Sequence, residues 1–126
     1  MNIALWVVAG ALALIFFASG LQKLIRSREQ LIASGLTFAE DFGDGSVRAI
    51  GVLEVLAAGG LILPATLEVM PTLVPLAATG LVLLMIGASA VHLRRGESTA
   101  VGVNLAFLTL AAVVAVGRFG PESFTS

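Results

Sequence analysis

The stretch that decides the fold is Ile50–Pro64, IGVLEVLAAGGLILP, an apolar run that carries one carboxylate, Glu54, and closes with a proline. If this run crosses a bilayer as a helix, Glu54 lies about two turns inside the hydrocarbon edge at a rise of ~1.5 Å per residue. An ionised side chain at that depth costs roughly 2.5 kcal/mol or more unless it finds a partner. We therefore expect a partner, a shared proton or a ligand at Glu54.

The composition of the whole chain indicates a membrane protein. Of its 126 residues 58% are hydrophobic and only 12% are charged, which is more apolar surface than a small soluble core can bury. Cysteine is absent, so disulfides, redox-active dithiols and thiolate metal sites are excluded. The net charge is −1 and no long basic run is present, so we expect no nucleic-acid partner.

Four apolar segments are each close to the ~20 residues that cross a bilayer, at about 3–25, 47–64, 72–93 and 100–118. Backbone amides in lipid must be satisfied within the segment, so all four are predicted to be helices. The connection at 26–46 is long and polar, whereas the other two are short and require antiparallel neighbours. The sequence thus predicts an all-α, integral membrane, antiparallel four-helix transmembrane bundle that forms a single domain over residues 1–126.

Basic residues near the span ends predict the orientation in the membrane. They flank the first and third connections, at Lys23, Arg26, Arg28 and Arg48 and at Arg94 and Arg95. By the positive-inside rule these two connections face the cytoplasm and both termini face outward. We expect a multi-pass protein of a bacterial inner membrane.

A layer of polar side chains is predicted in the cytoplasmic half of the bundle. All four spans contribute to this layer, which consists of Ser19, Gln22 and Lys23, then Glu54, then Ser89 and His92, and then Asn104. Glu54 shares its helix face with small residues, which directs it toward a neighbouring helix rather than toward lipid. The expected partners of Glu54 are Lys23 or His92, with Asn104 or Ser19 completing its hydrogen bonds.

Three roles remain open for this layer: a polar clamp that sets helix register, a site for the polar head of a lipophilic ligand, or proton-coupled transport through an intramembrane carboxylate. Lys23 and Arg118, at span ends, are most simply interpreted as snorkelling anchors, and a functional role for Lys23 is the alternative. His92 is the single histidine, and with Glu54 it supplies too few ligands for a closed metal site, so no metal is expected. No catalytic motif is present, and we assign no catalytic residue.

Seven short motifs, in this order and spacing, resemble the DoxX-like family of small four-span membrane proteins over nearly the whole chain. They are Gly20–Leu24, Ile50–Glu54, Gly60–Pro64, Leu76–Leu81, Met85–Ala88, His92–Glu97 and Gly117–Phe119. The family takes its name from a membrane subunit associated with thiosulfate:quinone oxidoreduction, and its relatives include membrane-embedded assembly factors. By this resemblance Lys23, Glu54 and His92 fall at the polar positions of the family.

The resemblance implies two functional classes. The first, which we favour, is a non-catalytic accessory subunit or assembly factor of a larger membrane complex, or a homo-oligomer, with a lipophilic-ligand pocket around Glu54. The second is a quinone-binding subunit of a membrane oxidoreductase. Because the chain has no cysteine, no tyrosine and one histidine, any electron transfer would need a bound quinone and the redox centre of a partner.

Overall fold

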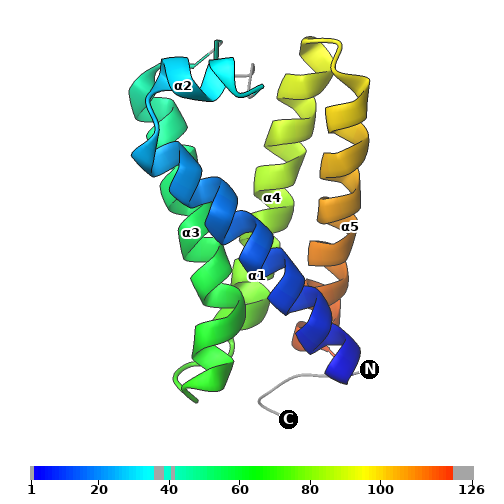
Figure 1. The fold of residues 1–126 in the computed structure, drawn as a ribbon. Helices are drawn as coiled ribbons and strands as arrows, with labels where there is room; N and C mark the ends of the chain where they lie inside the picture. Colours follow the sequence, from blue (N-terminus) through cyan, green and yellow to red (C-terminus); the bar gives the residue numbers. More distant parts are fainter. Residues whose placement is uncertain (1, 36–38, 41, 121–126) are drawn as a thin grey trace.

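The computed structural model describes residues 2–35, 39–40 and 42–120, and within them the chain forms five helices and no strand (Figure 1). Four helices are long, namely α1 (Asn2–Ile25), α3 (Asp44–Thr66), α4 (Leu73–Arg94) and α5 (Ser98–Phe119). All four are long and apolar enough to cross a membrane. The predicted all-α bundle with four membrane-spanning helices is therefore confirmed.

The second span is longer than the sequence predicted. Helix α3 begins at Asp44 rather than at 47, because its first turn is polar and extends beyond the apolar run. It also continues past Pro64 to Thr66. Pro64 has no N–H to donate to the preceding turn. The chain beyond it nevertheless remains helical, and Leu67 N–H closes the last turn by donating to the Leu63 carbonyl oxygen at 2.8 Å.

The four long helices pack as two pairs. The most extensive contacts are those of α1 with α3 and of α4 with α5, while α3 against α4 and α1 against α5 join the pairs more loosely. In Figure 1 α1 crosses the bundle diagonally, lying beside α3 at its C-terminal end and approaching the end of α5 at its N-terminus. The two pairs therefore separate toward the end of the bundle where α1 finishes.

The core between the helices is apolar, and the outer surface is apolar too. Large side chains such as Ile3 and Leu14, which are 78% and 75% exposed, point outward, as expected for helices that face lipid. The buried side chains of the core come from all four long helices. They are Leu5, Ala9, Leu12, Phe16, Ala58, Leu61, Val74, Ala78, Leu81, Met85, Ala111, Val114 and Ala115.

Two glycines allow α1 and α3 to approach each other closely. A Cβ atom added to Gly20 would lie 2.6 Å from the carbonyl oxygen of Gly51, and one added to Gly51 would lie 2.9 Å from the carbonyl oxygen of Gly20. Backbones this close leave no room for a side chain, as in other small-residue contacts between membrane helices. This contact fixes which residues of α1 and α3 can meet.

The long connection contains a short helix, α2 (Arg28–Ala33), which lies across one end of the bundle (Figure 1). Ser27 caps it, and the Ser27 and Gln30 side chains satisfy each other's backbone N–H groups. Leu31, Ala39 and Val47 form a small separate core beneath it. The connection at 26–46, predicted only as long and polar, thus contains a helix whose Leu31 packs with Val47 in the first turn of α3.

Candidate functional site

The buried carboxylate of Glu54 is paired with Lys23. The Lys23 Nζ lies 2.7 Å from Glu54 Oε1, and the two residues are only 6% and 3% exposed. Lys23 is one turn from Gly20 on α1 and Glu54 is one turn from Gly51 on α3, so the close glycine contact brings the two side chains together. Lys23 is therefore a buried partner of Glu54 and not a snorkelling anchor.

The pair lies below the surface of the bundle. Arg48 donates from Nη1 to the carbonyl oxygen of Leu24 at 2.9 Å and so marks the C-terminal end of α1. Glu54 lies about 9 Å farther along α3 at ~1.5 Å per residue. At this depth a lone charge would be costly, and the ion pair offsets much of that cost.

The ion pair uses one carboxylate oxygen of Glu54, Oε1, and the other oxygen, Oε2, lies outside it. Lys23 Nζ also donates a hydrogen bond to Ser19 Oγ at 2.7 Å, which fixes the ammonium group on α1. Within the described part of the chain, Glu54 Oε2 is buried and has no hydrogen-bond partner. A buried carboxylate oxygen normally accepts a hydrogen bond, so Oε2 is a candidate acceptor for a bound ligand.

Beside the pair is a cavity of about 470 Å³ between the two helix pairs. Ser19, Lys23 and Glu54 line it from α1 and α3, and His92 and Asn104 line it from α4 and α5. The remaining lining is apolar, with Ile15, Phe16, Phe42, Ile50, Leu83, Leu84, Met85, Gly87, Ala88, Val91 and Phe107. A mostly apolar cavity with a few convergent polar groups is the usual character of a small-molecule site.

The cavity extends to the surface that faces lipid. Among its lining residues Ile15 is 42% exposed and Leu83 is 65% exposed, and both lie within membrane-spanning helices. Its inner wall includes Phe16 and Phe107, whose rings meet edge to face with centroids 5.3 Å apart. A molecule in this cavity could therefore keep an apolar tail in the bilayer and a polar head near Glu54.

The structure brings five of the seven predicted polar residues to this cavity. Asn104 holds its Nδ2 buried without a hydrogen-bond partner among the described residues. The Oγ of half-buried Ser89 is also buried and has no hydrogen-bond partner among the described residues, but Ser89 does not line the cavity, and neither does the half-buried Gln22. The polar lining of the cavity thus has fewer residues than the predicted polar layer.

His92 lines the cavity without contacting Glu54. Its Nδ1 lies 2.7 Å from Glu97 Oε1, across the short turn between α4 and α5. Glu97 is close to His92 in sequence, so this contact requires no particular packing of distant helices. Of the two partners predicted for Glu54, Lys23 forms the ion pair with it, whereas His92 is paired with Glu97.

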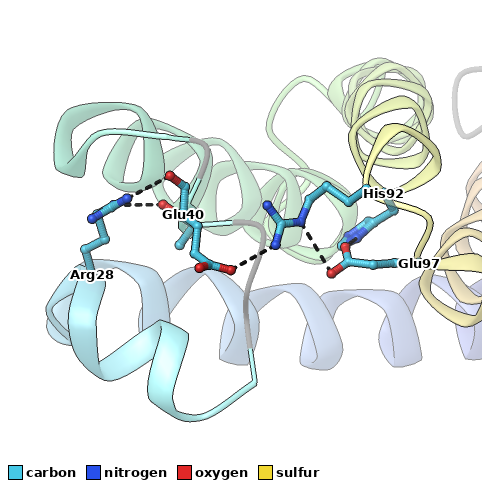
Figure 2. Close-up of polar contacts among 6 residues, drawn as sticks. Arg28, Glu40, His92 and Glu97 are labelled. Carbon is cyan, nitrogen blue, oxygen red and sulfur yellow. Dashed lines mark hydrogen bonds and ion pairs between the residues drawn. The ribbon is translucent and has the colours of Figure 1, made fainter.

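A second polar network, which the sequence did not predict, lies at the end of the bundle near α2 (Figure 2). Arg28 donates to the carbonyl oxygens of Ala39, Glu40 and Phe42 at 2.7–2.8 Å. Arg95 Nη2 lies 2.9 Å from Glu40 Oε1, and Arg95 Nε lies 3.4 Å from Glu97 Oε2. Because Phe42 lines the cavity, this network, here called the mouth network, holds the connecting loop at its rim.

At the opposite end Arg118 joins the two ends of the described chain. It is 3% exposed and donates from Nη1 to Asn2 Oδ1 at 2.7 Å, and its guanidinium lies 5.8 Å from the Trp6 ring centroid. Arg118 is therefore a buried link between α1 and α5 and not a snorkelling anchor. Across the described residues, no group of three or more His, Asp or Glu side chains could hold a metal ion.

These observations define a small helical membrane protein with four spans and a polar pocket between its helix pairs. The chain belongs to the DoxX-like family, whose model matches residues 7–114. No curated protein and no solved structure matches the chain.

Proposed function

We propose that this protein binds the polar head of a lipophilic small molecule in the cavity beside Glu54. The observation that carries the proposal is Glu54 Oε2, a carboxylate oxygen that is buried, adjacent to an ion pair and without a hydrogen-bond donor in residues 2–35, 39–40 and 42–120. A hydrogen bond to such a charged group is worth about 1.5–3 kcal/mol. A bound head group with a donor would supply this bond.

The shape of the cavity supports a lipophilic rather than a water-soluble ligand. Most lining residues are apolar, and exposed members such as Leu83 lie on membrane-facing surfaces. The aromatic wall of Phe16 and Phe107 suits a ring or a branched hydrocarbon. An isoprenoid quinone has this shape, and its reduced form also carries the hydroxyl donor that Glu54 Oε2 requires.

Proton-coupled export of cations is less consistent with the geometry. Lys23 already lies 2.7 Å from Glu54, so a cation would have to displace a buried ammonium group to reach the carboxylate. We therefore propose a non-catalytic role in which the protein holds its ligand for, or within, a larger membrane assembly. Affinity purification in mild detergent should then recover a larger membrane complex, and recovery of a monomer or homodimer alone would contradict the accessory role.

The ligand proposal is tested by identifying the lipophiles that purify with the protein. Wild type in nanodiscs should retain one molecular species in near-stoichiometric amount by native mass spectrometry, whereas the double variant Lys23→Met/Glu54→Leu should lose it. The double variant removes both charges and so leaves no unpaired ion in the membrane. Ser89→Ala, which removes a buried hydroxyl outside the cavity, is the matched control. Equal retention by all three proteins would contradict the proposal.

We also propose that the α2 end faces the cytoplasm and both termini face outward, in a bacterial plasma membrane. The chain has no native cysteine, so single substitutions report topology without background. In intact cells a membrane-impermeant thiol reagent should label Thr72→Cys, in the connection between α3 and α4, and should spare Thr99→Cys, near the start of α5. Both positions are exposed. The reverse labelling would invert the orientation.

A further inference from the structure

We infer that the cavity selects an uncharged lipophile with a hydroxyl head, such as a phenol or an alcohol, which donates to Glu54 Oε2 and accepts from Asn104 Nδ2. This inference rests on the proposed function, because it specifies the chemistry of the ligand in the same cavity. It depends on three features of the described residues: the charge balance of the pair, the kind of atom left without a partner on each side, and the level at which these atoms lie.

The ion pair makes the polar end of the cavity neutral overall. Lys23 and Glu54 both line the cavity, and their charges oppose each other at 2.7 Å. Because the two charges lie side by side, a cationic head placed at Glu54 also lies close to the ammonium of Lys23, and an anionic head placed at Lys23 also lies close to the carboxylate of Glu54. In a medium of low dielectric constant these repulsions are costly, so an uncharged head is favoured.

Two atoms of cavity-lining residues, Glu54 Oε2 and Asn104 Nδ2, have no hydrogen-bond partner in the described part of the chain, and they are complementary to one small group. Glu54 Oε2 accepts hydrogen bonds, so its ligand must carry an O–H or N–H donor. Asn104 Nδ2 donates, so its ligand must carry an acceptor. A hydroxyl is the smallest group that supplies both. A quinone would meet this requirement only in its reduced, hydroxyl-bearing form.

Helix register supports a shared site for these two atoms. Phe16 on α1 and Phe107 on α5 are in ring contact, which places these turns at one level. Ser19 lies one turn beyond Phe16 toward the α2 end of the bundle, and it accepts a hydrogen bond from Lys23 Nζ. Asn104 lies one turn beyond Phe107 toward the same end. Asn104 is therefore on the same level as the ammonium that pairs with Glu54.

The inference is tested with two probes that differ in a single donor, 4-nonylphenol and its methyl ether 4-nonylanisole. Binding to wild-type protein in nanodiscs is measured by native mass spectrometry, with empty nanodiscs used to correct for partition into lipid. We expect the phenol to bind at least about tenfold more tightly than the ether, since only the phenol can donate to Glu54. Dodecyltrimethylammonium, a cation of similar length, should bind more weakly than the phenol.

Two variants test whether Glu54 and Asn104 make the proposed contacts with the phenol. Glu54→Gln replaces the acceptor-only carboxylate by an amide that can also donate to an ether, so the preference for the phenol should fall to less than about threefold. Asn104→Leu leaves the ion pair intact and should weaken phenol binding by severalfold, which keeps the test decisive if Glu54→Gln does not fold. Ser89→Ala should retain the wild-type preference.

The outcomes separate the inference from the proposed function. Equal binding of phenol and ether to wild type would overturn the inference while leaving a lipophile-binding cavity. Binding of neither probe would contradict both. Tighter binding of the cation, an unchanged phenol preference in Glu54→Gln, or an unchanged phenol affinity in Asn104→Leu would overturn the proposed head-group contacts.

Discussion

The buried pair of Lys23 and Glu54 and the mouth network of Arg28, Glu40 and Arg95 use similar charges at similar distances in different surroundings. The closest N–O distance is 2.7 Å for the pair and 2.9 Å between Arg95 and Glu40. The side chains of the pair are 7% and 4% exposed, whereas those of Arg95 and Glu40 are 19% and 52% exposed. Burial, not distance, therefore determines how much each contact matters for the fold.

The largest expected effect is that of breaking the buried pair on one side. Lys23→Met leaves Glu54 as a buried charge without its ammonium partner, so the free energy of unfolding should fall by about 3–5 kcal/mol. Unfolding in mixed micelles at increasing mole fractions of dodecyl sulfate measures this change.

The double variant Lys23→Met/Glu54→Leu provides the control for this prediction. It removes both charges, so most of the lost stability should return. If the double variant were less stable than Lys23→Met by a further several kcal/mol, the two side chains would not act as a pair.

A smaller loss of stability is expected at the contact between α1 and α3, the helices that carry Lys23 and Glu54. Gly20→Ala places a Cβ 2.6 Å from the Gly51 carbonyl oxygen, so α1 and α3 must move apart, at a cost of about 1–3 kcal/mol. The same unfolding assay measures the loss. Gly10→Ala is the matched control on α1, since no atom of the described residues lies within 4 Å of its added Cβ. Equal stability of the two variants would mean that α1 and α3 do not pack through Gly20.

The smallest effect is expected in the mouth network. Arg95→Gln removes partly exposed ion pairs, so stability should change by no more than about 1 kcal/mol. Hydrogen exchange of the loop at 42–43 should nevertheless become faster, because Glu40 loses its link to Arg95. Raising the salt concentration should reproduce this change in wild type and should leave the buried pair unaffected.

The neighbouring exposed arginine serves as the control for the network. Arg94→Gln removes the same charge from the same turn without removing the contact to Glu40, so the exchange rate of the loop should not change. Faster exchange in both variants would attribute the effect to net charge rather than to the ion pair.

The fold was predictable from the sequence because the bilayer leaves few alternatives. Four apolar runs of sufficient length must become helices, and two short connections make neighbours antiparallel. The need of Glu54 for a partner was predictable for the same reason, since an isolated charge in lipid is costly. Both conclusions follow from the low polarity of the bilayer, and neither depends on how the side chains pack.

The choice of partner and the mouth network were not predictable in this way. Lys23 rather than His92 meets Glu54 because Gly20 and Gly51 set the register of α1 on α3, and small residues are too common in these spans to single out that contact. Glu40 and Arg95 meet because Arg28 holds the backbone of the connecting loop. Hydrogen bonds to backbone carbonyl oxygens do not depend on residue type, so no sequence pattern predicts them.

The central claim, that Glu54 Oε2 accepts a hydrogen bond from a ligand in the cavity, is tested most directly by infrared difference spectroscopy of the protein in bilayers. Subtracting the spectrum of Glu54→Gln from that of wild type isolates the carboxyl bands of Glu54. We expect 4-nonylphenol to shift these bands, because it donates to Oε2, and 4-nonylanisole to leave them in place. Bands that respond to neither molecule, or that shift equally with both, would contradict this assignment of Glu54.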